Sequence, residues 1–239
     1  KKKYKFKILE DACHAFGAEY KHKNKIIKIG SCTHSDIAIF SFHAIKTITT
    51  GEGGMLSTNN KNFFLKAKIS RSHGILRKKN SHWKYLISDF GMNYRLSDLN
   101  CALGISQLIK VKKFLNKRKK IHDFYCKKII QYKDFCKIRP KISSNKSANH
   151  LLILLFNLNN FKIKKEFIFN YFKKNNIYLQ YHYPIIKNFK VCDEKHKINY
   201  HGALQFYNSS ISFPIHPNLR NKELKKIFSV LDKFIIKYK

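Results

Sequence analysis

The sequence has 239 residues, of which 44% are hydrophobic and 14% aromatic, so a sizeable core can form and a wholly disordered chain is excluded. The formal net charge is +35, from 49 Lys and Arg against 14 Asp and Glu. The basic residues are mostly lysine and are scattered along the chain, whereas a dedicated nucleic-acid site usually gathers arginine and aromatic residues. We therefore predict no specific nucleic-acid partner, although nonspecific attraction to polyanions at low salt is expected.

The cysteine pattern and the apolar runs favour a cytoplasmic protein without a membrane partner. Six cysteines lie without Cys-x-x-Cys pairs, which is typical of reduced thiols in a cytosol. The basic start is not followed by the apolar stretch of a secretory signal, and the longest strongly apolar run, residues 151–156, is too short to span a bilayer. Since the sequence lacks a starting Met and opens on a strand pattern, we expect it to be a piece of a longer protein.

The first part of the chain alternates strand patterns with turns. We predict strands at residues 6–9, 37–42 and 55–58. The run at 37–42 is almost unbroken in its apolar character, as in a sheet that is covered on both faces. Residues 60–70 follow as a helix, and a long helix begins near Ser97, whose hydroxyl is a good N-cap, and continues to about residue 130.

A second unit follows a polar loop at residues 143–149. Its predicted elements are strands at residues 151–156 and 177–182 and helices at 164–174 and 221–236. This order indicates an α+β domain. We place the domain boundary in the long helix, which gives a first domain at residues 1–114 and a second at residues 115–239.

Three segments in the first hundred residues carry side chains suited to chemistry. Residues 10–18 (EDACHAFGA) place Asp11 at the end of a predicted strand, where open α/β sheets bind ligands; an Asp that caps a turn is the alternative. Residues 41–54 (SFHAIKTITTGEGG) place Lys46 after a buried strand among small and glycine residues, a setting that suits a nucleophilic amine; an ordinary exposed lysine is the alternative. Residues 91–98 (GMNYRLSD) precede the long helix and on their own are typical of a capped helix start.

In this order and at these intervals, the three segments resemble the DegT/DnrJ/EryC1/StrS family of sugar aminotransferases. The resemblance extends over nearly the whole chain. Further segments similar to the family are residues 71–75 (RSHGI), 101–108 (CALGISQL), 181–184 (YHYP) and 212–217 (SFPIHP). The form of residues 41–54 is most similar to the subgroup that acts on 4-keto nucleotide sugars.

The resemblance implies an α/β fold. Residues 1–114 would form part of the large domain of a fold-type I pyridoxal 5'-phosphate (PLP) transferase, with a mixed, mostly parallel sheet, and residues 115–239 a smaller α+β domain. Family members carry a preceding segment that includes a helix N-terminus at the cofactor phosphate and an aromatic residue on the cofactor ring. The implied activity is transamination of a UDP-linked 4-keto-6-deoxy hexose by an amino-acid donor, by family habit glutamate, for surface-glycan or flagellin sugars.

The same resemblance implies roles around PLP. Lys46 would be the Schiff-base lysine, and Asp11 would pair with the pyridine nitrogen and keep it protonated. His14 would lie beside the ring near its phenolic oxygen, and Ser41 would bind the phosphate. Asn93 would reach the phosphate held by a neighbouring subunit, which implies a homodimer with shared active sites.

Two histidines are implied as contacts of the nucleotide sugar. His43 precedes the lysine in the same segment, and His182 lies in the family's His-Tyr segment. The second histidine that often follows in the family is missing here, where Lys187 and Asn188 stand nearby. The identity of the sugar is therefore not given by this segment.

Other functions are open on the sequence alone. Cys192, His196 and His201 have ligand-like spacing, but no second cysteine pair or His-Glu-x-x-His motif accompanies them, so we predict no metal. The main rival is a fragment or fold relative that has lost catalysis and acts as a binding protein. The second rival is a nonspecific binder of polyanions such as nucleic acid.

Overall fold

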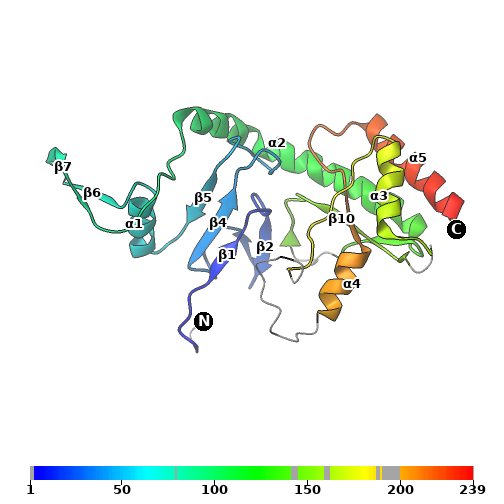
Figure 1. Cartoon of the computed structure of the whole chain (residues 1–239), viewed down its shortest axis with the longest axis horizontal. Helices are drawn as coiled ribbons and strands as arrows, with labels where there is room; N and C mark the ends of the chain where they lie inside the picture. The colour runs from blue at the N-terminus through cyan, green and yellow to red at the C-terminus, as the bar shows by residue number, and fades with distance from the viewer. Residues whose placement is uncertain are drawn as a thin grey trace. The chain divides into compact units, whose positions relative to one another are not determined.

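The fold is given by a computed structural model (Figure 1). It describes residues 3–78, 80–140, 145–158, 162–186, 189 and 200–238. The chain divides into two compact units. Unit 1 contains Lys1–Leu115 and Ser143–Ala148, and unit 2 contains Asn116–Ile142 and Asn149–Lys239. The division falls inside the long helix α2 (Asp98–Ile129), and Ser143–Ala148 returns to unit 1.

Unit 1 is built on a mixed sheet in the order β1-β4-β5. β1 (Leu9–Asp11) pairs in parallel with β4 (Ile37–Ser41), and β4 pairs in antiparallel fashion with β5 (Gly54–Ser57). Alternate residues of β4 point to opposite faces, and one face is fully buried through Ala38 and Phe40. The buried cluster of this sheet consists of Ala12, Cys32, Ala38 and Phe40.

Two hairpins and a helix complete the rest of unit 1. β2 (Glu19–His22) and β3 (Lys25–Lys28) form a hairpin, and β9 (Asn145–Lys146) pairs with the other edge of β2. α1 (Lys61–Ser70) is capped by Asn60, whose side chain accepts hydrogen bonds from two backbone amides of the first turn. The second hairpin joins β6 (Ile75–Lys78) to β7 (Ser81–Ile87).

Helix α2 starts directly after Ser97, as predicted, and the Ser97 hydroxyl accepts from the backbone N–H of Asn100 at 3.3 Å. In its second half, the buried Arg118 guanidinium donates to the backbone carbonyls of Asn149, His150 and Ile215 at 3.4, 3.2 and 2.8 Å. Burial lowers the pKa of Arg118 to about 10. Arg118 thus satisfies three carbonyls where the chain enters and leaves the sheet of unit 2.

Unit 2 packs the second half of α2 and three further helices with an antiparallel sheet in the order β11-β10-β8. The strands are β8 (Cys136–Ile138), β10 (Leu152–Phe156) and β11 (Ser210–Phe213), and the helices are α3 (Lys165–Lys174), α4 (His201–Ser209) and α5 (Asn221–Tyr238); a short 3₁₀ turn (Ile130–Tyr132) ends α2. Leu154, Ile168, Leu231 and Phe234 are wholly buried in one continuous core. The near-continuous apolar run at residues 151–156 is explained by this burial, because β10 is the central strand.

The structure corrects two predicted strands. The strand predicted at residues 6–9 lies later, at Leu9–Asp11. The strand predicted at residues 177–182 is wrong, because only Gln180 pairs there, in an isolated bridge with Ser212. Ile177 and Leu179 are buried in the core of unit 2, so their alternation reflects core packing and not a ladder of strand hydrogen bonds.

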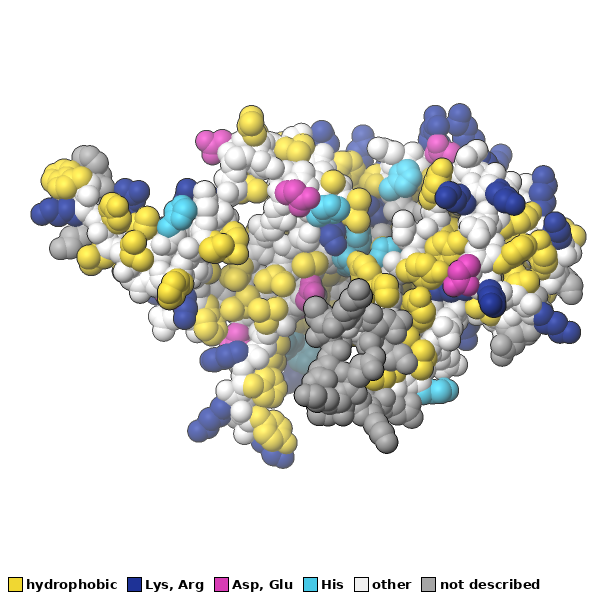
Figure 2. Space-filling view, viewed as in Figure 1, with side chains coloured by type: hydrophobic (Ala, Val, Ile, Leu, Met, Phe, Trp, Pro, Cys, Tyr) yellow, Lys and Arg dark blue, Asp and Glu magenta, His cyan; other side chains and the backbone are white. Residues whose placement is uncertain are grey.

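The charged side chains do not gather in one place on the face in view. Figure 2 shows Lys and Arg spread among hydrophobic and uncharged side chains on that face. Within the described part of the chain, no helix has both the length and the apolar character needed to cross a membrane.

Candidate functional site

Asp11 and Ser41 lie at the carboxyl ends of two adjacent parallel strands. β1 ends at Asp11, which is in register with Ile39 of β4, and β4 ends two residues later at Ser41. The chain then continues from Asp11 through Ala12, whose backbone N–H donates to the Ile39 carbonyl at 2.9 Å. The carboxyl end of parallel strands is the edge at which open α/β sheets bind their ligands.

The Asp11 carboxylate is held in its ionised form. Its Oδ1 atom accepts the backbone N–H of Cys13 at 3.0 Å. Hydrogen bonds from Cys13 are the main reason why the pKa of Asp11 is lowered, and the positive charges of His14 and Lys46 lower it further, while burial opposes them. Asp11 therefore does cap a turn, which is the alternative that the sequence left open, and its pKa also responds to His14 and Lys46.

Lys46 lies in a loop that is closed at its neck. This Lys46 loop consists of residues 42–53, which connect β4 to β5. The backbone N–H of Phe42 donates to the Gly53 carbonyl at 2.8 Å, and the N–H of Thr50 donates to the Phe42 carbonyl at 2.9 Å. Inside the loop, the N–H of Lys46 itself donates to the His43 carbonyl at 3.0 Å. The loop thus has an internal hydrogen-bond frame that fixes the backbone at Lys46.

Helix α2 supports the Lys46 loop from outside. The Asn100 side-chain amide donates to the carbonyl of Thr50 and to that of Glu52, the latter at 3.4 Å. Gly104 lets the helix approach, because a Cβ atom there would lie 2.9 Å from Thr50 Cγ2. Gly53 has a φ of +154°, and a Cβ atom there would collide with the Thr50 hydroxyl. The glycines of this region therefore serve the packing of the loop.

Cys13 belongs to the same cluster, although the sequence analysis assigned it no role. Burial and its interaction with the Asp11 carboxylate raise the pKa of the Cys13 thiol, and the charge of Lys46 opposes this rise. Asp11, Cys13, His14 and Lys46 are thus coupled through hydrogen bonds and charge at one edge of the sheet. An Asp at the end of a strand often accepts the backbone N–H two residues later in a turn. This pattern at Asp11 is the sequence signal that could have identified Cys13.

Ser41 and His43 lie at the start of the Lys46 loop. The Ser41 hydroxyl oxygen accepts the backbone N–H of His43 at 3.4 Å. The His43 ring nitrogen Nε2 lies 3.6 Å from Oε1 of Glu52. Both side chains therefore lie on the segment that carries Lys46, with His43 turned toward an acidic residue at the far end of the loop.

The other two predicted residues are fixed by different parts of the chain. Asn93 is exposed and pairs with Ser72 in an isolated bridge just after α1, and the next residue's N–H donates to the Arg71 carbonyl at 2.9 Å. His182 belongs to unit 2, where its Nδ1 atom lies 2.7 Å from the Ser212 hydroxyl. Asp11, His14, Ser41, His43 and Lys46 are thus grouped around the two strand ends, while Asn93 and His182 are not part of that group's hydrogen-bond frame.

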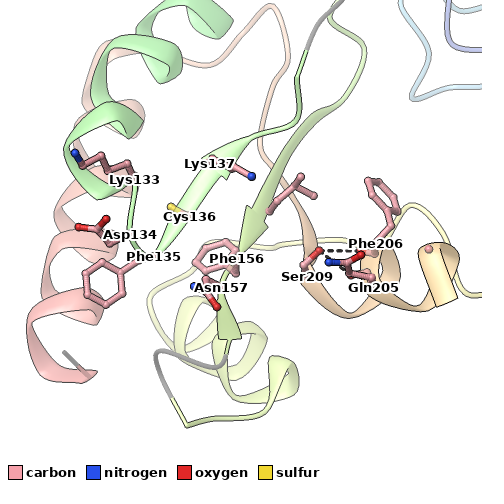
Figure 3. Close-up of a pocket in the computed structure, with 12 residues that line it drawn as sticks. Lys133, Asp134, Phe135, Cys136, Lys137, Phe156, Asn157, Gln205, Phe206 and Ser209 are labelled. Carbon is pink, nitrogen blue, oxygen red and sulfur yellow. Dashed lines mark hydrogen bonds between the residues drawn. The ribbon is translucent and has the colours of Figure 1, made fainter.

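Unit 2 also contains a hollow that holds none of the predicted residues. Its volume is about 630 Å³, and Phe156, Asn157, Gln205 and Ser209 are among the residues around it (Figure 3). Cys136 lies at its wall, but burial raises the pKa of this thiol to about 12, so it is not a nucleophile at neutral pH. We therefore do not place the chemistry in this hollow.

The residues of the zinc alternative lie largely outside the described part of the chain. Cys192 and His196 fall there, and His201 is the first residue of α4. Among the residues that the structure describes, no group of three His, Cys, Asp or Glu side chains is arranged to hold a metal ion.

Comparisons with known proteins identify the family. The DegT/DnrJ/EryC1/StrS aminotransferase family matches residues 1–232, which confirms the resemblance seen in the sequence. The UDP-4-amino-4,6-dideoxy-N-acetyl-beta-L-altrosamine transaminase of Campylobacter jejuni (strain 81-176) is 40% identical over 238 residues, which are 97% of this chain and 60% of that protein. This chain thus spans about 60% of the length of that relative.

Solved structures agree with the expected fold class. PseC of Helicobacter pylori, an aminotransferase involved in the biosynthesis of pseudaminic acid, matches with a TM-score of 0.86 and 32% identity over 98% of this chain and 61% of that protein. The sugar aminotransferase Spr1654 of Streptococcus pneumoniae, solved in its PLP form, matches with a TM-score of 0.80 and 25% identity over 95% of this chain and 58% of that one.

Proposed function

This chain belongs to the DegT/DnrJ/EryC1/StrS aminotransferase family, and from that membership we propose that it is the lysine-bearing part of a PLP-dependent nucleotide-sugar aminotransferase. The observation that carries the proposal is the placement of Asp11 and Ser41 at the carboxyl ends of the parallel strands β1 and β4, with Lys46 on the loop that leaves β4. A carboxylate with a lowered pKa and an amine at one edge of the sheet are groups that this chemistry requires.

The residues at this edge of the sheet fit PLP by their chemistry. Lys46 offers the amine for covalent attachment, and Asp11 offers a carboxylate that is ionised when the pyridine nitrogen must stay protonated. His14 would lie beside the ring near its phenolic oxygen, and the Ser41 hydroxyl would bind the phosphate. When bound, PLP supplies an electron sink for the carbon from which a proton is removed.

Lys46 then has a second task as an acid and base. When PLP is bound, the Nζ atom of Lys46 would be the group that accepts and returns the proton exchanged during transamination. The hydrogen-bond frame of the Lys46 loop fixes the backbone from which this side chain extends, because the backbone N–H of Lys46 is bonded within the loop.

The substrate we propose is a UDP-linked 4-keto-6-deoxy hexose that is aminated at C4, with glutamate as the amino donor. The similarity to transaminases that act on a UDP-linked amino sugar supports this choice. His43 and His182 contact the nucleotide sugar in this proposal. We place the reaction in the cytoplasm, in line with the reduced thiols of Cys13 and Cys101.

We also infer a domain assignment and a homodimer. Residues 1–114 form the PLP-binding part and residues 115–239 the small domain. In this homodimer, Asn93 would reach the phosphate bound by the other subunit. Exposed apolar side chains support a partner surface, because Phe90 before α2 and Leu99 and Ile109 in the first half of α2 are 99%, 85% and 79% exposed. Apolar side chains exposed to this extent are candidates for burial at an interface.

The experiment that tests the proposal is PLP attachment to Lys46. We expect the purified chain to show visible absorbance with PLP, and borohydride reduction followed by peptide mapping to place the label on Lys46. Lys46→Ala should abolish both signals with an unchanged circular dichroism spectrum, because the amine is the point of attachment. Lys61→Ala, a change of an exposed lysine in α1, should change neither. A label that persists in Lys46→Ala would show that another amine holds the cofactor.

A further inference from the structure

Lys165 is a buried cation that contacts aromatic rings from separate parts of unit 2. It is the first residue of α3, and its side chain is only 7% exposed. Its Nζ atom lies 4.3 Å from the ring centroid of Tyr181 and 4.7 Å from that of Tyr207, and it also donates to the Tyr207 backbone carbonyl. A desolvated ammonium at such distances from two rings is strongly attracted to both.

The rings around Lys165 are themselves stacked, and together we call them the Lys165 stack: Lys165, Phe169, Tyr181 and Tyr207. The Tyr181 ring is stacked on Phe169 at 4.4 Å and on Tyr207 at 5.8 Å between centroids. Phe169 belongs to α3 and Tyr207 to α4, while Tyr181 lies in the segment before His182. The stack thus ties this segment to two helices.

The residues on either side of Tyr181 are bonded to Ser212 of β11. The backbones of Gln180 and Ser212 exchange two hydrogen bonds, at 3.1 and 2.9 Å. The His182 ring bonds to the Ser212 hydroxyl at 2.7 Å. Tyr181 therefore anchors one side of the segment in the Lys165 stack, while its two neighbours bind β11 on the other.

We propose that Lys165 is a positioning residue for His182, and that it fixes the backbone of residues 180–182 so that His182 is presented to the nucleotide sugar. The substrate part of this inference rests on the proposed function. The positional part rests only on the contacts of the Lys165 stack with Tyr181 and Tyr207.

The contacts of Lys165 with the rings of Tyr181 and Tyr207 depend on pH, because they need the charged form of the Lys165 amine. Burial lowers the pKa of Lys165 to about 8, and the Glu166 carboxylate on the same helix opposes this shift. The other titratable groups that face it are Tyr181, whose pKa is raised by burial, and Tyr207 of α4. As the pH rises through 8, Lys165 loses its proton and its attraction to both rings weakens.

The positional part is tested by amide hydrogen exchange in the 239-residue chain. We expect Lys165→Met to speed exchange at Gln180 and Ser212 roughly tenfold, since the loss of the cation–π contacts loosens the segment. Lys165→Arg should stay close to the unchanged protein, and Lys164→Met, a change of the exposed neighbour, should have no effect. Equal exchange in Lys165→Met and Lys164→Met would overturn the inference.

The substrate part is tested with UDP-N-acetylglucosamine as a binding probe and with the keto sugar in turnover. We expect Lys165→Met to raise the probe's Kd and the sugar's KM about tenfold with little change in kcat. In the unchanged protein both constants should rise above pH 8, whereas in Lys165→Arg they should stay flat. Faster exchange with an unchanged KM would overturn the link to His182. A chain that binds neither PLP nor the probe would contradict the proposed function, while the exchange data would still decide the positional part.

Discussion

Asp11 is the side chain that most directly sets the electronics of the proposed cofactor. Its pKa lies below the ordinary value of 3.8, first through its hydrogen bonds from Cys13 and then through the charges of His14 and Lys46. Asp11→Asn removes the charge and keeps the size of the group. We expect PLP to stay bound and transamination to fall on the order of 10²-fold or more. Cofactor absorbance and single-turnover rates measure the two effects separately.

The matched control for this change is Glu10→Gln, which alters the preceding carboxylate of the same strand. It should leave both the absorbance and the rate near their original values. Because the folded pKa of Asp11 is depressed, its charge persists as the pH falls through 3.8 and is lost only below that value. Near-normal turnover in Asp11→Asn would remove the role at the pyridine nitrogen.

At the residue scale, the sequence identifies the groups that we propose to react but not those that hold them. Asp11 and Lys46 can be found because they lie in local segments with a recognisable order. Asn100 cannot be found this way, because its amide binds the Thr50 carbonyl from 50 residues away. Cys13 was missed because its part in the cluster depends on the bend of the backbone after β1.

At the scale of elements, the start of α2 should control the rigidity of the Lys46 loop. Asn100→Ala removes the amide that binds the carbonyls of Thr50 and Glu52. We expect a loss of about 1–2 kcal/mol in the free energy of unfolding and faster loss of PLP on dialysis. Urea denaturation and residual absorbance measure these effects. Asn62→Ala, in the exposed face of α1, is the control and should change neither. Equal PLP retention in both variants would contradict a supporting role for Asn100.

Elements could be predicted where burial produces a clear sequence pattern, as in the helix periodicity of α2 and α5 and the apolar run of β10. The β2–β3 hairpin gave no such signal, because its turn uses Lys23 and Asn24 at positive φ and contains no glycine. Residues 177–182 gave a false strand signal. The core of unit 2 buries alternate side chains there, but only Gln180 pairs with another strand, at Ser212. Periodicity reports which side chains are buried, and it does not report what the backbone is bonded to.

At the scale of the whole molecule, charge and apolar surface act against each other in self-association. The formal net charge of +35 makes two copies of the chain repel each other. The exposed apolar side chains around the start of α2 favour association. Salt screens the repulsion over about 8 Å at physiological ionic strength and leaves the apolar contact intact, so the proposed homodimer should strengthen as salt is added. Subunit mixing is therefore best done at physiological salt or above.

If the active sites are shared between subunits, as we propose, two inactive variants should restore activity when they form a mixed dimer. Lys46→Ala and Asn93→Ala should each retain little PLP and little activity alone. In a mixed dimer, one site combines the intact Lys46 of one chain with the intact Asn93 of the other. Random mixing in equal amounts should therefore restore about a quarter of the original sites. Borohydride labelling of Lys46 and turnover both count them. Mixed dimers that form without any recovery would place Asn93 in the site of its own subunit, because then every site, in parental and mixed dimers alike, would carry one damaged residue.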